Sequence, residues 1–209
     1  MKIPVELFDN RKQEFVDAEL FDDITPEDFE EIEAQWRPLV QEAKRKLIEM
    51  GKPDMVPQHA HWDWTRKAPE LEMLAIRFFG IQCKQRLQGI VKLQTVGYES
   101  RILGHRGKPL VYIDYVEVAP WNVRMLTEPL GKKTEFRAVG TRLMEVAIRV
   151  SIDEDFKGRV GLHSLPRSEG YYINECGMTA VDRDPSKQNL LWCEFTPDQA
   201  KAFLPGESK

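Results

Sequence analysis

The stretch that decides the fold is LVYIDYVEVAPWNVRMLTEPLGKKTEFRAVGTRL, which runs from Leu110 to Leu143. Its first part is β-branched and aromatic and ends at Pro120, which cannot continue a ladder, so we expect a strand over residues 110–119. Small residues at Gly140-Thr141 then open an apolar helix of about residues 139–152. Backbone N–H groups at such a helix start have no carbonyl partners, which favours binding of an anion such as a pyrophosphate.

The segments around this stretch predict a mixed sheet. Two strand-like runs precede it, residues 71–83 and 86–96, and the polar turn Lys84-Gln85 between them indicates an antiparallel hairpin. Residues 97–109 read as an exposed loop because glycine recurs in them. The strand that we expect at 158–164 follows a helix, so strand, helix and strand should form a parallel, right-handed crossover. A short helix around 168–175, a last strand at 189–195 and a helix start at Thr196-Pro197 complete the pattern.

The N-terminal part predicts a strand and a long helix. Residues 3–7 fit a short edge strand, and a polar segment follows to Asp23. Thr25-Pro26 begins a helix in which apolar residues recur at helical spacing, and Pro38 should kink it or divide it in two. We expect residues 1–70 to form an extension packed on a core of residues 71–209, within one structural domain overall.

The composition excludes several classes of protein. The chain has 209 residues, is 42% hydrophobic and 31% charged, and carries a formal charge of −4, which fits one soluble domain. The mild acidity argues against a nucleic-acid binder, and no apolar run is long enough to span a membrane. MKIPVELFDN at the start has no signal-peptide core. The three cysteines lack CxxC spacing, so we expect reduced core residues in a cytoplasmic protein, without structural zinc.

The segment HAHWDW has an unusual local composition. His59, His61 and Asp63 alternate as metal ligands could, but no HExxH or comparable pattern accompanies them, so we expect no metal. We expect Trp62 and Trp64 instead to anchor the segment against the core, while its polar residues line or cover a cleft.

Three short stretches, VEVAPWN, RAVGTRLM and YYINECGM, occur in the order found in one superfamily. Together with the order of elements, they make the chain from Leu71 to Phe195 resemble the GNAT superfamily of acyl-CoA-dependent N-acetyltransferases. The resemblance implies an α/β (α+β) fold: a mixed, largely antiparallel central sheet flanked by helices, here with a helical N-terminal extension. It also implies direct transfer of an acetyl group from acetyl-CoA to an amine.

The resemblance assigns a cofactor cradle to the opening stretch. Val118-Ala119-Pro120 matches the strand end of the family, and the backbone amides of the following turn would hold the CoA pyrophosphate. The cofactor-binding residues that it implies are Val118, Arg137, Ala138, Val139, Gly140, Thr141 and Arg142. Lys132 and Lys133 add positive charge nearby. This sequence departs from the family in having Ala138 for the earlier glycine, Glu135 for an Arg or Gln, and a longer connection after Pro120.

The resemblance also implies the catalytic residues. Tyr172 is the first candidate for the acid that protonates the departing CoA thiolate, and Tyr171 is the second. Glu117 is the candidate base that takes the proton of the amine, with Asp114 or a water as alternatives. The structural alternative for Glu117 is a carboxylate that pairs with a neighbouring cation. His163 and Ser164 border the expected cleft, but we find no acid with suitable spacing to complete a triad.

Two hypotheses follow. The leading one is an acetyl-CoA-dependent N-acetyltransferase that acts on an amine-bearing small molecule or peptide. The alternative is a non-catalytic GNAT-fold module that binds a protein partner through its acidic N-terminal half or the HAHWDW segment. Neither involves nucleic acid or a membrane, and we leave a homodimer open as the assembly.

Overall fold

The computed structural model describes residues 2–206, and its contacts divide these into two compact units. Unit 1 holds residues 2–73, 78–90 and 116–142, and unit 2 holds residues 74–77, 91–115 and 143–206. Several long elements contribute residues to both units. The expected N-terminal extension, residues 1–70, belongs to unit 1 as far as it is described.

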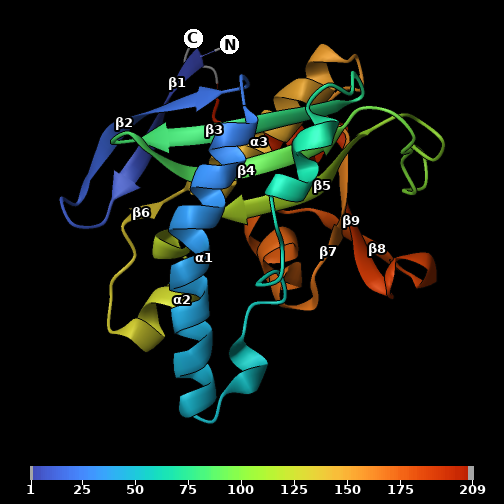
Figure 1. The fold of residues 1–209 in the computed structure, drawn as a ribbon. Helices are drawn as coiled ribbons and strands as arrows, with labels where there is room; N and C mark the ends of the chain where they lie inside the picture. Colours follow the sequence, from blue (N-terminus) through green and yellow to red (C-terminus); the bar gives the residue numbers. More distant parts are fainter. Residues whose placement is uncertain (1, 207–209) are drawn as a thin grey trace. The chain divides into compact units, whose positions relative to one another are not determined.

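Hydrogen bonds join the strands in the order β6-β1-β2-β3-β4-β5-β7-β9-β8 (Figure 1). The β1–β2, β1–β6, β2–β3, β7–β9 and β8–β9 pairs are antiparallel, whereas β5 and β7 are parallel. The predicted mixed, largely antiparallel sheet is therefore confirmed. The strands are β1 (Lys2–Asp9), β2 (Glu14–Phe21), β3 (Ile76–Cys83), β4 (Arg86–Gln94), β5 (Val111–Val118), β6 (Phe136–Arg137), β7 (Val160–Ser164), β8 (Thr179–Asp184) and β9 (Leu190–Phe195).

Unit 1 begins with a hairpin of which the sequence predicted only the first strand. β1 and β2 pair along their whole length, from Lys2↔Phe21 to Asp9↔Glu14, so the supposed polar segment before Asp23 is largely a strand. β1 is not an edge strand either, because β6 pairs with its other side. The acidic residues of β2 interrupt the alternation of apolar and polar residues by which a strand is predicted. Pairing with β1 stabilises the extended backbone of β2.

Helix α1 (Pro26–Glu49) is the main helix of unit 1. Thr25 caps it in a reciprocal capping box with Asp28, as the start signal predicted. Pro38 lies inside this undivided helix, so of the two expected effects, a kink or a division into two helices, the division is wrong. A proline removes one intrahelical hydrogen bond, but the buried stripe on either side of it favours an undivided helix. That stripe consists of Phe29, Ile32, Trp36, Val40, Ala43 and Leu47.

The connection after Pro120 contains more structure than the sequence indicated. Short helical turns flank α2 (Arg124–Thr127), and β6 ends the connection at Arg137. Leu126 of α2 packs against Val40 and Ala43 of α1 in one buried cluster. The insertion is therefore folded onto α1 within unit 1.

Unit 2 contains the predicted parallel crossover. α3 (Val139–Asp153) leads to β7, whose last pair with β5 is Ile113↔Leu162. Both strands continue beyond that pair, β5 to Val118 and β7 to Ser164, so their pairing with each other stops before either strand ends. β8 was not predicted, whereas α4 (Pro197–Phe203) begins in a capping box at Thr196, as expected.

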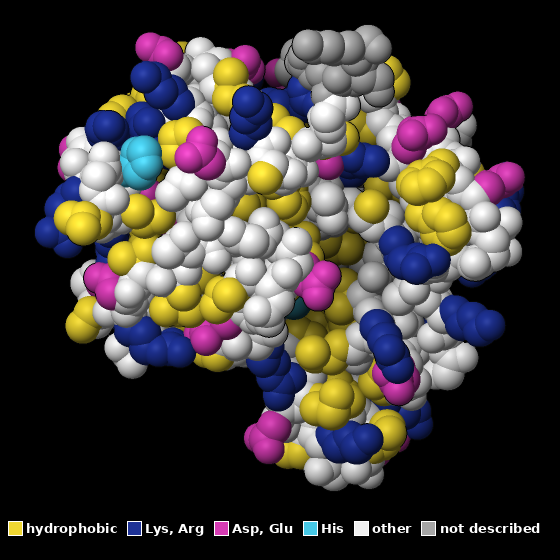
Figure 2. All heavy atoms as spheres, turned by 180° about the vertical axis from the view of Figure 1, so that it is seen from behind, with side chains coloured by type: hydrophobic (Ala, Val, Ile, Leu, Met, Phe, Trp, Pro, Cys, Tyr) yellow, Lys and Arg dark blue, Asp and Glu magenta, His cyan; other side chains and the backbone are white. Residues whose placement is uncertain are grey.

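The distribution of surface charge and the state of the cysteines agree with what the composition indicated. Figure 2 shows positive and negative side chains interspersed over one face rather than gathered by sign. Cys83, Cys176 and Cys193 are free and buried, as predicted. Within residues 2–206, we find no helix with the length and hydropathy that crossing a membrane requires.

Candidate functional site

The start of α3 has the backbone geometry of an anion site. Ala138 immediately precedes the helix and has φ of +72°, in the left-handed region. The amide N of Arg142 donates to the Ala138 carbonyl at 2.9 Å, so the amides of residues 139–141 lie before this first helical hydrogen bond. A left-handed alanine costs about 1 kcal/mol and a glycine almost nothing, which accounts for the glycine that the resembled family has here.

Both arginines of the expected cradle contact strand β1. The Arg137 guanidinium lies 4.4 Å from the centroid of the Phe8 ring, and Arg142 Nε donates to the Glu6 carbonyl at 3.2 Å. Arg137 is exposed and Arg142 is half-buried. Val118, the remaining expected contact in unit 1, is half-buried at the end of β5.

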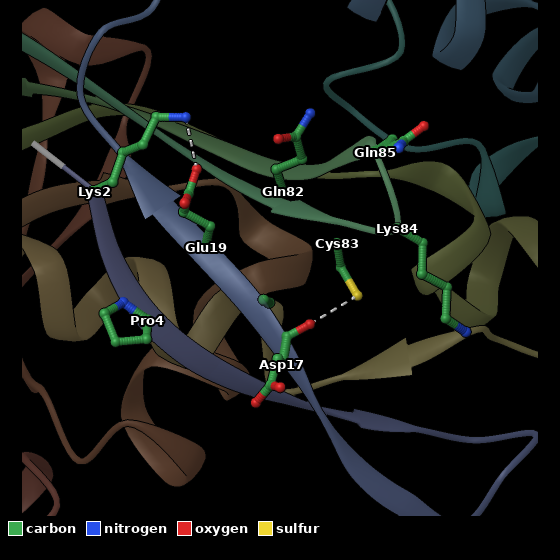
Figure 3. A pocket seen from close by; sticks show the side chains of 9 residues that line it. Lys2, Pro4, Asp17, Glu19, Gln82, Cys83, Lys84 and Gln85 are labelled. Atoms are coloured by element: carbon green, nitrogen blue, oxygen red, sulfur yellow. Dashed lines mark hydrogen bonds and ion pairs between the residues drawn. The ribbon is translucent and has the colours of Figure 1, made fainter.

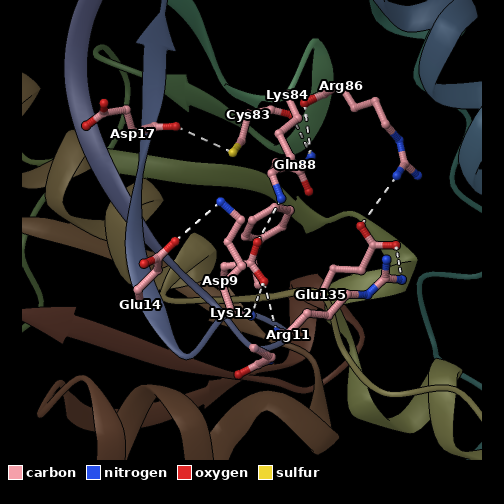
Figure 4. A network of polar contacts seen from close by, with 12 residues as sticks. Asp9, Arg11, Lys12, Glu14, Asp17, Cys83, Lys84, Arg86, Gln88 and Glu135 are labelled. Atoms are coloured by element: carbon pink, nitrogen blue, oxygen red, sulfur yellow. Dashed lines mark hydrogen bonds and ion pairs between the residues drawn. The ribbon is translucent and has the colours of Figure 1, made fainter.

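A polar network holds the chain that enters this turn (Figure 4). Glu135 Oε1 lies 3.4 Å from Arg11 Nη2, and Glu135 Oε2 lies 3.4 Å from Arg86 Nη1. The Arg86 guanidinium also stacks on the Trp121 ring at 3.8 Å. Glu135, which replaces the family's Arg or Gln, therefore links the turn to the N-terminal hairpin and to β4.

Glu117, the expected base, is enclosed. Arg37 Nη2 donates to both carboxylate oxygens at 2.8 Å, and the Trp64 indole N–H donates to Oε2 at 2.6 Å. Its side chain is 2% exposed. Burial raises the pKa of Glu117, and the bonds from Arg37 and Trp64 oppose that rise. The surroundings match the structural alternative, a carboxylate paired with a neighbouring cation.

Glu33 shares the same arginine and is more accessible. Its Oε2 lies 3.1 Å from Arg37 Nε, its Oε1 accepts from the Trp64 backbone amide at 2.9 Å, and its side chain is 22% exposed. Burial is the main cause that raises the pKa of Glu33. Sequence reasoning missed this residue, although Glu33 and Arg37 at i, i+4 flank the buried Trp36 and form a recognisable pair.

The HAHWDW segment, which includes Trp64, lies beside the cluster of Glu33, Arg37 and Glu117. Trp64 is fully buried, as predicted, whereas Trp62 is half-buried, with its ring 5.4 Å from that of His59. Burial, with Arg37 nearby, lowers the pKa of His59 to about 4, so this imidazole is neutral near pH 7. No three His, Cys, Asp or Glu side chains within the described part of the chain gather as a metal site would.

In unit 2, Tyr172 lies on a single π-helical turn, Tyr171–Glu175. The side chain is buried, and burial raises the pKa of its phenol, which therefore stays protonated near neutral pH. The Tyr171 ring meets it edge-on at 5.3 Å and is half-buried. The Tyr172 phenol is therefore in the protonated state that an acid requires, and the raised pKa also makes it a weaker acid than a free tyrosine.

His163 has a carboxylate partner that the sequence spacing did not suggest, but Ser164 is not part of the arrangement, because its hydroxyl donates to the Leu165 carbonyl at 2.9 Å. Asp184 Oδ2 lies 3.1 Å from His163 Nε2, and the Tyr112 hydroxyl lies 3.0 Å from His163 Nδ1. Hydrogen bonds from Ser186 and then from Arg101 hold the pKa of Asp184 well below its usual range. The ionised carboxylate requires the proton on Nε2, so Tyr112 donates to Nδ1. Asp184 ends β8, the strand that the sequence did not reveal.

Asp114, the alternative base, has a different environment in unit 2. It lies 2.6 Å from Lys92 Nζ and accepts from Gln94 Nε2 at 3.0 Å. The Lys92 side chain is nearly buried, so this carboxylate neutralises a cation inside the sheet.

A separate hollow opens on the N-terminal hairpin (Figure 3). Its polar contacts are an ion pair between Lys2 and Glu19 at 2.9 Å and a bond from Cys83 Sγ to the Asp17 carbonyl at 3.5 Å. Burial raises the pKa of Cys83, so its thiol is protonated and a poor nucleophile. We therefore assign no chemistry to this hollow.

Comparison with known proteins identifies the fold. No family model matches the sequence, and no curated protein matches it. An uncharacterized protein from Bacillus halodurans is 11% identical with a TM-score of 0.55, over 96% of this chain and 93% of the other. The GNAT domain of S. lividans PAT is 14% identical with a TM-score of 0.52, over 93% and 96%. An aminoglycoside acetyltransferase, AAC(6')-Ib in complex with coenzyme A, is 11% identical with a TM-score of 0.52, over 88% and 98%. The chain therefore has the fold of the GNAT superfamily.

Proposed function

We propose that this chain is an acetyl-CoA-dependent N-acetyltransferase that transfers the acetyl group directly to an amine. The observation that carries the proposal is the start of α3, where the left-handed Ala138 leads into the helix with arginines on either side of it. The fold supports it, because a structural neighbour, AAC(6')-Ib, has been crystallised with coenzyme A and kanamycin (12% identity, TM-score 0.50).

The residues of this turn fit a pyrophosphate. The amides of Val139, Gly140 and Thr141 precede the first helical hydrogen bond, and a helix N-terminus favours negative charge. Arg137 and Arg142 would add charge-assisted hydrogen bonds to the phosphate oxygens. Ala138 and Gly140 are small enough to allow close approach to the backbone, and Val118 would border the site at the end of β5.

When bound, acetyl-CoA would supply the thioester acyl group. Tyr172 is the proposed acid, because its buried phenol remains protonated and could give its proton to the leaving sulfur atom. Tyr171 is the second candidate. We expect Tyr172→Phe to lower kcat by about a hundredfold or more, and Tyr171→Phe to lower it far less.

The amine must lose a proton before it attacks. Glu117 remains the predicted base, but its enclosure between Arg37 and Trp64 favours an anchoring role. Glu33, on the other side of Arg37, offers a more accessible carboxylate whose pKa burial raises toward neutrality. We therefore propose Glu33 as the competing candidate, and Glu33→Gln and Glu117→Gln as the pair of variants that separates the two.

The acceptor in this proposal is an amine-bearing small molecule or peptide. A thiol-release assay with acetyl-CoA and a panel of small amines, aminoglycosides and lysine peptides tests the reaction directly. We expect thiol release that depends on one class of amine. Binding of acetyl-CoA without turnover of any amine in a wide panel would favour a non-catalytic role instead.

A further inference from the structure

Strand β1 contacts the chain on both sides of the strained Ala138. Before it, β6 pairs with β1 in the register Phe8↔Arg137 and Asp9↔Phe136. The ladder extends by one more hydrogen bond, from the Asn10 amide to the Glu135 carbonyl at 2.8 Å. The backbone that enters the turn is thus fixed to β1 by main-chain pairing.

Strand β1 also holds one side chain on each side of Ala138, Arg142 after it and Arg137 before it. The Glu6 carbonyl accepts from Arg142 Nε at 3.2 Å, one helical turn beyond Ala138. The Phe8 ring lies beneath the Arg137 guanidinium, with 4.4 Å from its carbon to the ring centroid. Such a contact fixes where an exposed arginine directs its N–H groups.

Asn10, directly after β1, fixes Thr134 in the chain that enters the turn. Its Nδ2 donates to Thr134 Oγ1 at 2.8 Å and to the Thr134 carbonyl at 3.2 Å. The Asp9 carboxylate accepts from the Arg11 and Lys12 amides at 2.8 and 3.1 Å, which closes the hairpin turn that presents Asn10. The turn is thus ordered by its own hydrogen bonds as well as by the sheet.

These contacts explain how an alanine is kept left-handed. A strained backbone conformation persists only when its surroundings over-determine it, because the residue otherwise relaxes to a commoner region. Residues 134–137 are held on one side of Ala138 and Arg142 on the other, in both cases by β1 and the turn after it.

We propose that β1, through Phe8, and the turn that follows it, through Asn10, form a positioning element of the CoA cradle. Neither residue is proposed to touch the cofactor: Phe8 orients Arg137, and Asn10 holds the chain that keeps Ala138 left-handed. This inference rests on the proposed function for the identity of the ligand, but the positioning itself can be measured without a ligand.

The first experiment compares two phenylalanines whose rings meet edge-on at 5.3 Å. Phe8→Ala removes the support of Arg137, and Phe15→Ala removes a ring that is 59% exposed on the paired position of β2. By calorimetric titration of acetyl-CoA, we expect Phe8→Ala to weaken binding about tenfold and Phe15→Ala less than twofold, with kcat at saturating acetyl-CoA unchanged in both. Equal weakening in the two variants would overturn the role of Phe8.

The second experiment tests Asn10 by rescue. We expect Asn10→Ala to weaken acetyl-CoA binding about fivefold in the natural background and less than twofold when Ala138→Gly is also present, because glycine needs no restraint to remain left-handed. The exposed Glu14→Ala, whose ion pair is with Lys12 in the same hairpin, is the matched control and should change binding little. Equal losses with and without Ala138→Gly would overturn the role of Asn10.

A ligand-free readout separates this inference from the proposed function. By hydrogen exchange, Asn10→Ala should raise the exchange rate of the amides of residues 142–145 several-fold, because the helical hydrogen bonds begin at Arg142, while Glu14→Ala leaves it unchanged. If this occurs but the natural protein does not bind acetyl-CoA, the positioning stands and the proposed ligand is wrong. Unchanged exchange in Asn10→Ala would refute the positioning, whatever the ligand.

Discussion

Two buried glutamates, one in each unit, are held in contrasting ways. Glu117 in unit 1 accepts from Arg37 and from the Trp64 indole. Glu194 in unit 2 accepts from the Ser100 hydroxyl, the Arg101 amide and the Trp192 indole. Both carboxylates are almost completely inaccessible, and each is bonded by a fully buried tryptophan.

The difference lies in the remaining donors. Glu194 takes neutral donors from residues 100 and 101, so it fastens the loop 97–109 onto β9. Glu117 takes a guanidinium that it shares with Glu33, and Glu33 is partly open to solvent. Glu194 anchors a loop, whereas Glu117 is linked through Arg37 to Glu33, which is partly exposed. Of the two arrangements, only the second includes a carboxylate, Glu33, that is open to solvent.

Removing the shared cation should have the largest effect. Arg37→Met would leave Glu117 buried without its counter-charge, and we expect a loss of about 3–5 kcal/mol in the free energy of unfolding. Denaturant unfolding followed by fluorescence measures this loss. The double variant Arg37→Met/Glu117→Gln should recover part of it, and a double variant as unstable as the sum of both single variants would contradict the pairing.

Neutralising the other carboxylate should cost less. Glu194→Gln keeps the size of the side chain but places an amide group among three donors, and we expect a loss of about 1–3 kcal/mol. Limited proteolysis should also cut the loop 97–109 faster than in the natural protein. Resistance equal to that of the natural protein would mean that Glu194 does not fasten the loop.

The two tryptophans offer a matched pair. Trp64→Phe and Trp192→Phe each remove an indole N–H from a buried carboxylate, and we expect each to lower the free energy of unfolding by about 1–2 kcal/mol. Trp64→Phe should also change the KM for the amine, because the indole bonds Glu117, which shares Arg37 with Glu33, while Trp192→Phe should not. A change of KM in both variants or in neither would contradict the proposed difference between Glu117 and Glu194.

The pH dependence of Glu33→Gln should be the subtlest effect. Burial raises the pKa of Glu33, Asp63 and Glu117 add to the rise, and the Trp64 amide and Arg37 oppose it, so the basic form appears as the pH rises through a value above the ordinary one. If Glu33 is the base, kcat/KM rises over that range and Glu33→Gln loses this limb. Because the folded pKa lies above the unfolded one, ionisation of Glu33 opposes folding, and the substitution should slightly stabilise the protein near pH 7. An unaltered acid limb in the variant would assign the base elsewhere.

Local signals predicted much of the fold. Thr25 and Thr196 each stand before a proline at a helix start, and both form capping boxes. Lys84 and Gln85 both have positive φ, as a two-residue hairpin turn requires. Structure that depends on distant partners was missed: β2 is stabilised by β1, and β8, which is mostly polar, pairs with β9 across an irregular register.

The same distinction applies to the candidate site. The sequence indicates Ala138 and Gly140 as candidates because a turn before a helix leaves a local signature. Arg37 and Glu117 are separated by 80 positions, so no local pattern could join them. Asp184 reaches His163 only because β8 pairs beside β9, and missing that strand meant missing the acid.

The central claim is that the start of α3 binds acetyl-CoA, and thermal unfolding tests it most directly. Millimolar acetyl-CoA should raise the melting temperature of the natural protein by several degrees, because a ligand that binds only the folded state stabilises it. Gly140→Trp should abolish the shift, whereas Gly206→Trp, where an added side chain meets open space, should retain it. No shift in the natural protein, or an equal shift in all three, would contradict the claim.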